Sequence, residues 1–365
     1  MIPLFKTNVS PKAYKAVRNV LESGYLGEGE QVNKFSEKLQ KLWNTKNVVC
    51  TNSCTSALVL ALKLSGVGPG DKVICPSFTF HATAAAIHQL GAEIIWADTK
   101  GQAVSTFTTI SLVEQHKPKA AILTFVGGVV PEYPEQPLEI LQDICKKNST
   151  ALIFDLAHAL DTHYKSKHLC HQADFSCFSF QSIKHLTTGD GGALVCRDPW
   201  DMPRANRLKF FGLTRGVPQD RQVITDFGFK FHMNDIAAAI GLANFDIALE
   251  AVEKSRANAN LYRKKLRPNP DISQYINFAT LLEDRGSSDW VFGIGLYSPE
   301  PVKKALAKEG VESSFLWPLH LGCPTSDHRQ NYTLFIPNGF WVNPNEVEDV
   351  SEIILESVIE SKVII

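Results

Sequence analysis

Residues 178–192 read Phe-Ser-Phe-Gln-Ser-Ile-Lys-His-Leu-Thr-Thr-Gly-Asp-Gly-Gly and place Lys184 in a loop rich in hydroxyl side chains. The apolar runs 176–180 and 192–196 on either side of it indicate two strands of one sheet. Lysine is the side chain that forms imines with aldehydes, and partial burial lowers its pKa so that the amine can attack. The alternative is a solvated loop lysine, which describes most other lysines of the chain.

Short apolar runs alternate with helices of about ten residues on the N-terminal side of this loop. We expect strands at 48–50, 72–75, 93–96, 119–125 and 151–155, and helices at 11–22, 31–43, 55–65, 79–90, 109–115 and 136–147. This alternation predicts an α/β fold in three layers (α/β/α), with a mostly parallel sheet covered by helices on both faces.

Helical periodicity returns after the apolar runs, over 234–264, 301–309 and 345–361. These helices predict a second, smaller α+β domain at the C-terminus. We place the N-terminal arm and the large domain in residues 1–245, and the small domain in residues 246–365.

The composition narrows the classes of function. A chain of 365 residues with 44% hydrophobic residues and a net charge of −1 argues against a general nucleic-acid or anionic-membrane binder. We find neither an apolar run of about 18 residues nor an N-terminal signal peptide. The eight cysteines are scattered, several in apolar runs, and we interpret them as buried thiols of a cytoplasmic protein.

A cluster of metal-ligand residue types lies between positions 158 and 171. Its members are His158, His163, His168, Cys170 and His171. Their spacing fits no common zinc pattern, so we expect no metal site.

Two segments that follow predicted strands suggest a ligand with a phosphate and a flat ring. Asn52-Ser53-Cys54-Thr55-Ser56 opens a helix, whose free N–H groups and dipole suit a phosphate; simple capping by Ser53 or Thr55 is the alternative. Pro76-Ser77-Phe78-Thr79-Phe80 places aromatic rings where parallel sheets bind ligands, although core packing also explains them.

Asp155 ends the strongly apolar strand 151–155. A carboxylate there is unfavourable unless it is paired or reaches a cleft. A pyridinium nitrogen is one partner that would keep it ionised; a helix cap or a surface acid is the alternative.

Taken in chain order, these segments resemble the DegT/StrS-type sugar aminotransferases, which are pyridoxal-phosphate enzymes with the aspartate-aminotransferase fold. The run 179–192 resembles their cofactor-lysine segment. The resemblance covers nearly the whole chain: 23–29 is similar to their Ser-Gly loop, 53–58 to their phosphate loop, 76–83 to the segment of their ring-stacking aromatic, 154–159 to Glu-Asp-Ala-Ala-Gln-Ala, and 318–320 to a C-terminal Pro-Leu-His.

The resemblance implies a role for each matching residue. Lys184 would form the internal aldimine with pyridoxal 5′-phosphate and then act as the proton shuttle. Asp155 would pair with the pyridinium nitrogen, and His158, in place of a glutamine, would donate a hydrogen bond near the ring hydroxyl. The remaining contacts would be Phe80 on the ring, Thr55, Ser56 and Ser179 on the phosphate, and Tyr25, Leu26 and His320 on the substrate.

Several positions depart from the family pattern. Cys54 replaces a glycine of the phosphate loop, and Lys230 replaces an asparagine that reaches the cofactor phosphate of the neighbouring subunit. His232 replaces an arginine, and the segment 266–316 looks short beside the family.

The reaction implied is transfer of an amino group from an amino acid, glutamate in our prediction, to a keto sugar linked to a nucleotide. The resemblance also implies amino-sugar synthesis for cell-surface polysaccharide and a homodimer with shared active sites, with no nucleic-acid or membrane partner. Three alternatives stay open: a sugar dehydratase of the same family, in which a histidine replaces the lysine, a relative that forms aminohydroxybenzoate, and a cofactor-binding regulatory protein without catalysis.

Overall fold

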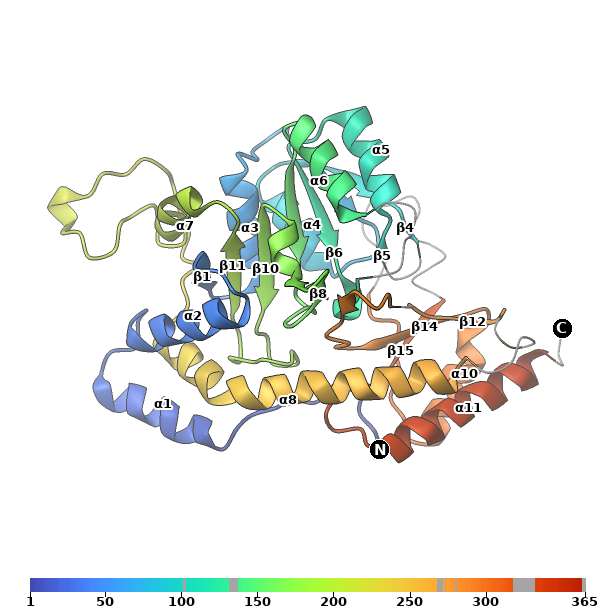
Figure 1. The fold of residues 1–365 in the computed structure, drawn as a ribbon. Helices are drawn as coiled ribbons and strands as arrows, with labels where there is room; N and C mark the ends of the chain where they lie inside the picture. The colour runs from blue at the N-terminus through green and yellow to red at the C-terminus, as the bar shows by residue number, and fades with distance from the viewer. Residues whose placement is uncertain are drawn as a thin grey trace.

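The structure is a computed structural model that describes residues 1–100, 103–130, 137–267, 272, 274–279, 281–317 and 332–362. Its centre is a seven-stranded sheet with the order β1-β11-β10-β7-β6-β2-β3 (Figure 1). The strands are β1 (Val48–Thr51), β2 (Lys72–Pro76), β3 (Glu93–Ala97), β6 (Ala120–Thr124), β7 (Ala151–Asp155), β10 (Phe175–Ser179) and β11 (Gly192–Cys196). Strands β3, β2, β6, β7 and β10 are parallel, and β11 is antiparallel to both of its neighbours.

Helices cover both faces of this sheet. One face packs against α3 (Cys54–Leu64), α4 (His81–Gln89) and α7 (Met202–Leu208). The other packs against α2 (Glu30–Leu42), α5 (Thr106–His116), α6 (Leu138–Lys147) and the first half of α8 (Asp235–Lys265). Because side chains alternate along a strand, Ile153 and Phe154 enter different cores. The three-layer α/β/α fold predicted from the sequence is confirmed.

The C-terminal part has its own antiparallel sheet and core. Strands β12 (Ile276–Asn277), β14 (Phe292–Leu296) and β15 (Thr333–Ile336) pair in that order. Helices α10 (Pro299–Lys308) and α11 (Pro344–Lys362) pack on them. The N-terminal arm lies against this part, since Ile2 forms a β-bridge with Val311.

Helix α8 belongs to both cores. It runs unbroken along the two parts in Figure 1, and α1 (Lys12–Ser23) packs against it. Its Val252 lies in the core of the large sheet, whereas its Ala259 and Tyr262 lie in the C-terminal core. A boundary at residue 245 therefore falls inside a continuous helix, and the exact division stays a prediction.

Smaller elements surround the main sheet. Strands β8 (His163–Tyr164), β9 (Lys167–His168) and β13 (Arg285–Gly286) form a second three-stranded sheet, and β4 (Thr99–Lys100) pairs with β5 (Ala103–Val104). The helix expected from residue 79 begins at His81, because Phe80 is extended at its N-cap with φ −66° and ψ 145°. Within the described ranges, no helix has the length and apolar character needed to span a bilayer.

Candidate active site

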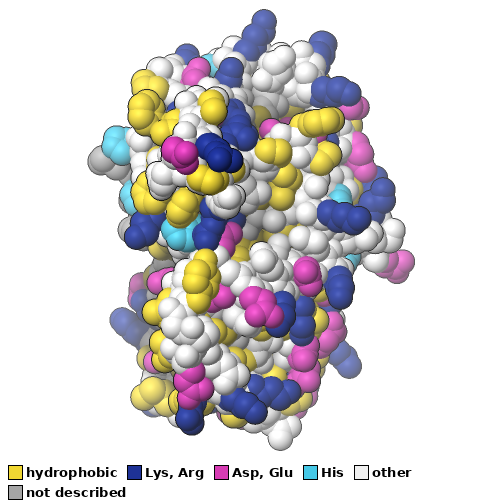
Figure 2. Space-filling model, turned by 90° about the vertical axis from the view of Figure 1, so that its left-hand side faces the viewer, with side chains coloured by type: hydrophobic (Ala, Val, Ile, Leu, Met, Phe, Trp, Pro, Cys, Tyr) yellow, Lys and Arg dark blue, Asp and Glu magenta, His cyan; other side chains and the backbone are white. Residues whose placement is uncertain are grey.

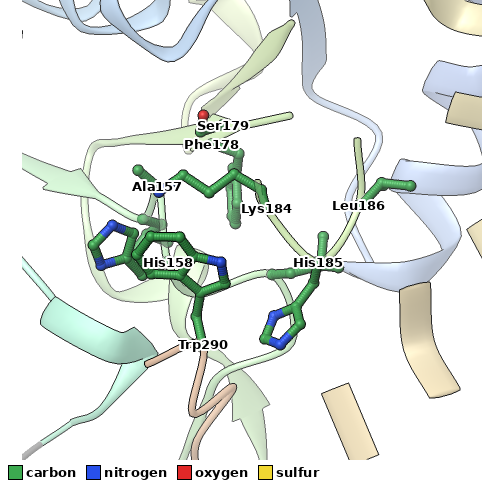
Figure 3. A pocket seen from close by; sticks show the side chains of 10 residues that line it. Ala157, His158, Phe178, Ser179, Lys184, His185, Leu186 and Trp290 are labelled. Atoms are coloured by element: carbon green, nitrogen blue, oxygen red, sulfur yellow. The ribbon is translucent and has the colours of Figure 1, made fainter. Parts of the chain in front are cut away.

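Lys184 lies in the loop between β10 and β11, at the edge of the sheet where the parallel strands end. Its backbone N–H donates to the Gln181 carbonyl at 2.9 Å, which closes a turn. Its Nζ lies 3.6 Å from the centroid of the Trp290 ring (Figure 3). Burial lowers the pKa of Lys184 to about 7, and the neighbouring Asp155 and Cys54 oppose that shift. The amine is therefore in part uncharged near neutral pH, the form that attacks a carbonyl.

Asp155 ends β7, in register with Cys177 of the adjacent β10. Its carboxylate accepts hydrogen bonds from Thr83 Oγ1 at 2.8 Å and from the Ala157 N–H at 3.1 Å, and the Cys54 thiol donates to it at 3.8 Å. Burial raises the pKa of Asp155, while these hydrogen bonds and the charge of Lys184 hold it down. A buried carboxylate beside the lysine is thus the main acidic group of the site.

Thr83 connects Asp155 to a line of hydroxyl groups. The Thr83 and Thr79 hydroxyls are 2.8 Å apart, and Thr79 lies 2.9 Å from Thr124 Oγ1. This line of hydroxyl groups holds the Asp155 carboxylate through Thr83. The sequence did not mark Thr83 as a site residue, because a threonine inside a helix gives no local signal of a buried partner.

His158 is buried next to the same lysine. Its Nδ1 accepts a hydrogen bond from the Gly127 N–H at 3.2 Å. Because burial lowers the pKa of His158 well below its usual value, the ring is neutral, and its proton is on Nε2. The ring centroid lies 4.1 Å from that of Trp290. Its Nε2–H is therefore available as a hydrogen-bond donor, and the role expected near the ring hydroxyl stays a prediction.

The N-terminus of α3 lies beside β11. Ser53 caps the helix, since its Oγ accepts the Ser56 N–H at 3.0 Å. The Ser56 hydroxyl donates to Asn52 Oδ1 at 2.6 Å. A Cβ at Gly192 would lie 2.4 Å from the Ser53 carbonyl carbon, so only glycine lets the strand approach this turn. Thr55 stays half-buried at this helix end, and a phosphate bound there would replace the Asn52 contact of Ser56.

The described contacts join only part of the predicted set. Lys184, His158 and Ser179 line one small pocket (Figure 3). The charge of Asp155 acts on Lys184 and opposes the lowering of its pKa. In the cluster of residues 158–171, a ring nitrogen of His168 and one of His171 each lie at a backbone carbonyl, and the His163 and His168 rings lie 5.5 Å apart. The described residues contain no group of three or more potential ligands that could hold a metal ion.

Phe80 and Phe78 differ in environment. Phe80 is 57% exposed, whereas Phe78 is buried with its ring 5.0 Å from that of Trp317. The core-packing alternative thus applies to Phe78, and Phe80 is the ring that is free to meet a ligand.

The N-terminal loop with Tyr25 and Leu26 forms a separate, charged cluster. Glu28 pairs with Lys209 at 2.6 Å and with Arg215 at 2.9 Å. Arg215 also donates to the Tyr25 hydroxyl at 3.2 Å. In the part of the chain that the structure describes, no hydrogen bond or ion pair joins this cluster to Lys184.

Lys230 and His232 lie near α3 through their backbone. The Lys230 carbonyl accepts from Asn52 Nδ2 at 3.3 Å, and His232 forms a β-bridge with Thr51. The Lys230 side chain is exposed, and His232 Nδ1 is buried without a hydrogen-bond partner among the described residues. His320, predicted on the substrate, lies outside the described residues.

Pyridoxal phosphate, which the sequence predicted, fits this set of side chains. Lys184 supplies an amine of lowered pKa, and the buried Asp155 carboxylate would pair with a protonated ring nitrogen. His158 supplies an N–H donor, and α3 supplies a helix N-terminus for a phosphate.

Comparisons with known proteins show the family of the chain. A profile described as the DegT/DnrJ/EryC1/StrS aminotransferase family matches residues 8–339. The chain is 28% identical over 293 residues to the spore coat polysaccharide biosynthesis protein SpsC of Bacillus subtilis (strain 168), a match that covers 77% of this chain and 72% of SpsC.

Two solved structures are also similar. The aminotransferase TlmJ from Streptoalloteichus hindustanus is 26% identical with a TM-score of 0.86, covering 99% of this chain and 100% of that one. The sugar aminotransferase CalS13 from Micromonospora echinospora shares the fold, with a TM-score of 0.89 at 23% identity over 98% of this chain and 100% of that one.

Proposed function

The chain belongs to the DegT/DnrJ/EryC1/StrS aminotransferase family, and from this premise we propose that it moves the amino group of glutamate to a keto sugar linked to a nucleotide. It is a pyridoxal-phosphate-dependent transaminase of the sugar aminotransferase type, so its substrates are an amino donor and a keto sugar. The cofactor, when bound, supplies the electron sink that stabilises negative charge at the donor α-carbon. What this chain contributes is attachment, orientation and the movement of protons.

Lys184 is the residue that carries the proposal. Its amine has a pKa of about 7 and lies beside the buried carboxylate of Asp155, which is the setting that covalent attachment and proton transfer both require. We assign to its Nζ the attachment of the cofactor and, once free, the removal of the proton from the donor α-carbon. The reverse transfer then delivers a proton to the sugar carbon that receives the amine.

The other side chains orient the cofactor in this proposal. Asp155 would keep the proton on the ring nitrogen, and His158 Nε2 would donate to the ring hydroxyl. Thr55, Ser56 and Ser179 would hold the phosphate at the start of α3, and the exposed ring of Phe80 would stack on the cofactor.

His185 follows Lys184 but does not share its place. Its Nε2 lies 3.0 Å from Ser255 Oγ on α8, and Figure 3 shows its ring turned away from Lys184. Lys184 is thus the side chain beside Asp155, and this favours transamination over the dehydratase alternative, in which a histidine replaces the lysine.

A homodimer with shared active sites is part of the proposal. The loop that carries η4 (Gln219–Arg221) projects from the body in Figure 1, and its Val223, Ile224 and Phe227 are exposed by 75%, 60% and 92%. Figure 2 shows hydrophobic side chains gathered with Lys and Arg on this side of the molecule. A second copy that covers this loop would bury them and bring its own Lys230 toward a phosphate site.

The biological setting follows from the same reasoning. SpsC is named for spore coat polysaccharide biosynthesis, and this supports a role in making an amino sugar for a cell-surface polysaccharide. The seven cysteines that the structure describes are buried and free, which supports our placement of the enzyme in the cytoplasm.

The test is to replace Lys184 with alanine and to measure two properties. The native protein should take up pyridoxal phosphate, show a visible absorption band that changes on addition of glutamate, and aminate members of a panel of nucleotide-linked keto sugars. Lys184→Ala should lose the transfer by a factor of about 10²–10⁴ or more.

Lys167→Ala, an exposed lysine of β9, is the matched control and should behave as the native protein. A Lys184→Ala variant that transaminates at the native rate would refute the role assigned to Lys184. A sugar product that has lost water without gaining nitrogen would identify a dehydratase, and a protein that never takes up cofactor would refute both.

A further inference from the structure

Trp290 contacts the lysine loop at two points. Its indole Nε1 donates to the carbonyl of Ile183, the residue before Lys184, at 2.9 Å. The face of the same ring lies under the amine, with Nζ 3.6 Å from the ring centroid. Figure 3 shows the indole between the Lys184 side chain and the loop of His158. One side chain thus holds both the backbone and the reactive end of the lysine.

The indole is itself fixed by aromatic neighbours. Phe5 of the N-terminal arm stacks on it, with centroids 5.0 Å apart and an interplanar angle of 17°. His158 lies against it at 4.1 Å. A ring with such neighbours has few alternative rotamers, so it offers a fixed surface to a flexible lysine stem.

The backbone at this point is also constrained. The Trp290 N–H donates to the Gly127 carbonyl at 2.8 Å, and Gly127 is the residue whose N–H fixes His158. Asp289, just before Trp290, has a positive φ of 44° and pairs through its buried carboxylate with Arg263 at 2.5 Å. A strained, buried residue held in this way places the next side chain accurately.

From these contacts we propose that Trp290 is a positioning residue that holds the free amine of Lys184 beside Asp155 and His158. The role follows from physical chemistry: an indole face attracts an ammonium group, and it also shields the neutral amine from water. The lysine leaves the cofactor during each half of the reaction, and it must return to the same place to move a proton. The inference rests on the proposed role of Lys184.

The first measurement uses the protein without cofactor. Labelling of Lys184 by acetic anhydride, followed across pH by peptide mass spectrometry, reports the titration of its amine. The native midpoint should be near pH 7. Trp290→Leu opens Nζ to water and also removes the attraction of the ring for the ammonium. Because burial is the largest cause of the lowered pKa, the first effect should dominate, and the midpoint should rise by about one pH unit or more toward the usual lysine value. Trp290→Phe keeps a ring in place and should stay near the native midpoint.

Trp317→Leu is the matched control. Trp317 lies in the same hydrophobic cluster and near the same histidine, but within the described ranges it makes no cation–π contact with Lys184. Its midpoint should remain native. Phe5→Leu removes only the ring that backs the indole, and a smaller upward shift is expected. The inference is overturned if Trp290→Leu titrates like Trp317→Leu, or, should Trp290→Leu not fold, if Phe5→Leu titrates like the native chain.

The second measurement uses the enzyme with pyridoxal phosphate. A misplaced lysine should lower kcat for Trp290→Leu by a factor of about 10 to 100, with a change of KM for the amino donor below about threefold. The two failures are distinguishable. Full transaminase activity of Lys184→Ala would refute the proposed function. If Lys184→Ala is inactive but Trp290→Leu has the native kcat and the native titration midpoint, only the role of Trp290 is refuted.

Discussion

The buried interior of the candidate site and the separate charged cluster around Glu28, a rim of exposed and half-buried side chains on the N-terminal loop, are held together by different forces. In the interior, Asp155 and His158 are buried and fixed by neutral donors, the hydroxyl of Thr83 and the N–H of Gly127. At the rim, Glu28 is clamped by two cations, and the neighbouring Tyr25 is exposed.

The difference separates a part of the chain that is rigid from a part that can respond to salt and to a partner. A buried network with neutral donors is screened little by salt, so its geometry should depend only weakly on ionic strength. A rim fixed by partly exposed ion pairs is weaker and depends on salt. The rim also adjoins the exposed loop 213–227, where we propose that a second copy binds. Lys184, Asp155 and His158 come from one chain, and we expect a partner to contribute to the phosphate and substrate sides of the site.

The largest effect should follow from a change in the interior. Asp155→Asn keeps the shape of the side chain and removes its charge, so the proton on the cofactor ring nitrogen loses its counter-ion. We expect kcat to fall by a factor of about 10²–10³, the usual cost of removing one electrostatic partner of a reacting system. Asp246→Asn, at an exposed position of α8, is the control and should retain native kinetics. A native kcat for Asp155→Asn would contradict the interior role of this carboxylate.

A pair of glycines tests whether the interior depends on close packing. A Cβ at Gly128 would lie 2.3 Å from the His158 carbonyl oxygen and 2.8 Å from Ser288 Cβ, and its φ is +75°. Gly128→Ala should therefore lower the free energy of unfolding by about 2–4 kcal/mol, measured by urea denaturation.

Gly189 has a similar φ of +84° but nothing within 4 Å of the added Cβ. Gly189→Ala should cost only about 1 kcal/mol, the backbone strain alone. Equal losses for the two variants would show that packing around Gly128 is not tight.

Changes in the rim should cost less than the loss expected for Gly128→Ala. Glu28→Gln leaves the buried ammonium of Lys209 without its counter-ion, and we expect a loss of about 1–3 kcal/mol in unfolding free energy. Arg215→Ala removes a half-exposed ion pair with Glu28 and an exposed hydrogen bond to Tyr25, and it should cost at most about 1 kcal/mol. The loss for Arg215→Ala should shrink further in 0.5 M salt; a loss independent of salt would argue against the electrostatic description of the rim.

Strand ends and the lysine loop could be predicted from the sequence because their signals are local. Strand 151–155 is found where predicted, and Asp155 ends it. The helix expected from residue 79 starts two residues later because Phe80 adopts an extended backbone, a choice that depends on the turn before it and not on helix propensity.

Other features could not be read from local pattern. Trp290 lies 106 residues beyond Lys184 in an irregular segment, and only tertiary packing brings the two together. The same holds for Gly127, whose importance comes from His158 on one side and Trp290 on the other. The domain boundary predicted at residue 245 lies inside α8. The apolar face of this helix continues without a break, so its periodicity gave no sign that it packs against two separate cores.

The continuity of α8 limits how this protein can be divided or recombined. The helix spans 31 residues, which is about 46 Å of rigid rod. One inserted or deleted residue in its middle would turn one end relative to the other by about 100°, so the apolar face could match only one of its two cores. Chimeras that exchange the C-terminal part with a relative must therefore join within this helix and keep its phase, and lineages that vary in length are expected to do so in the loops and not in α8.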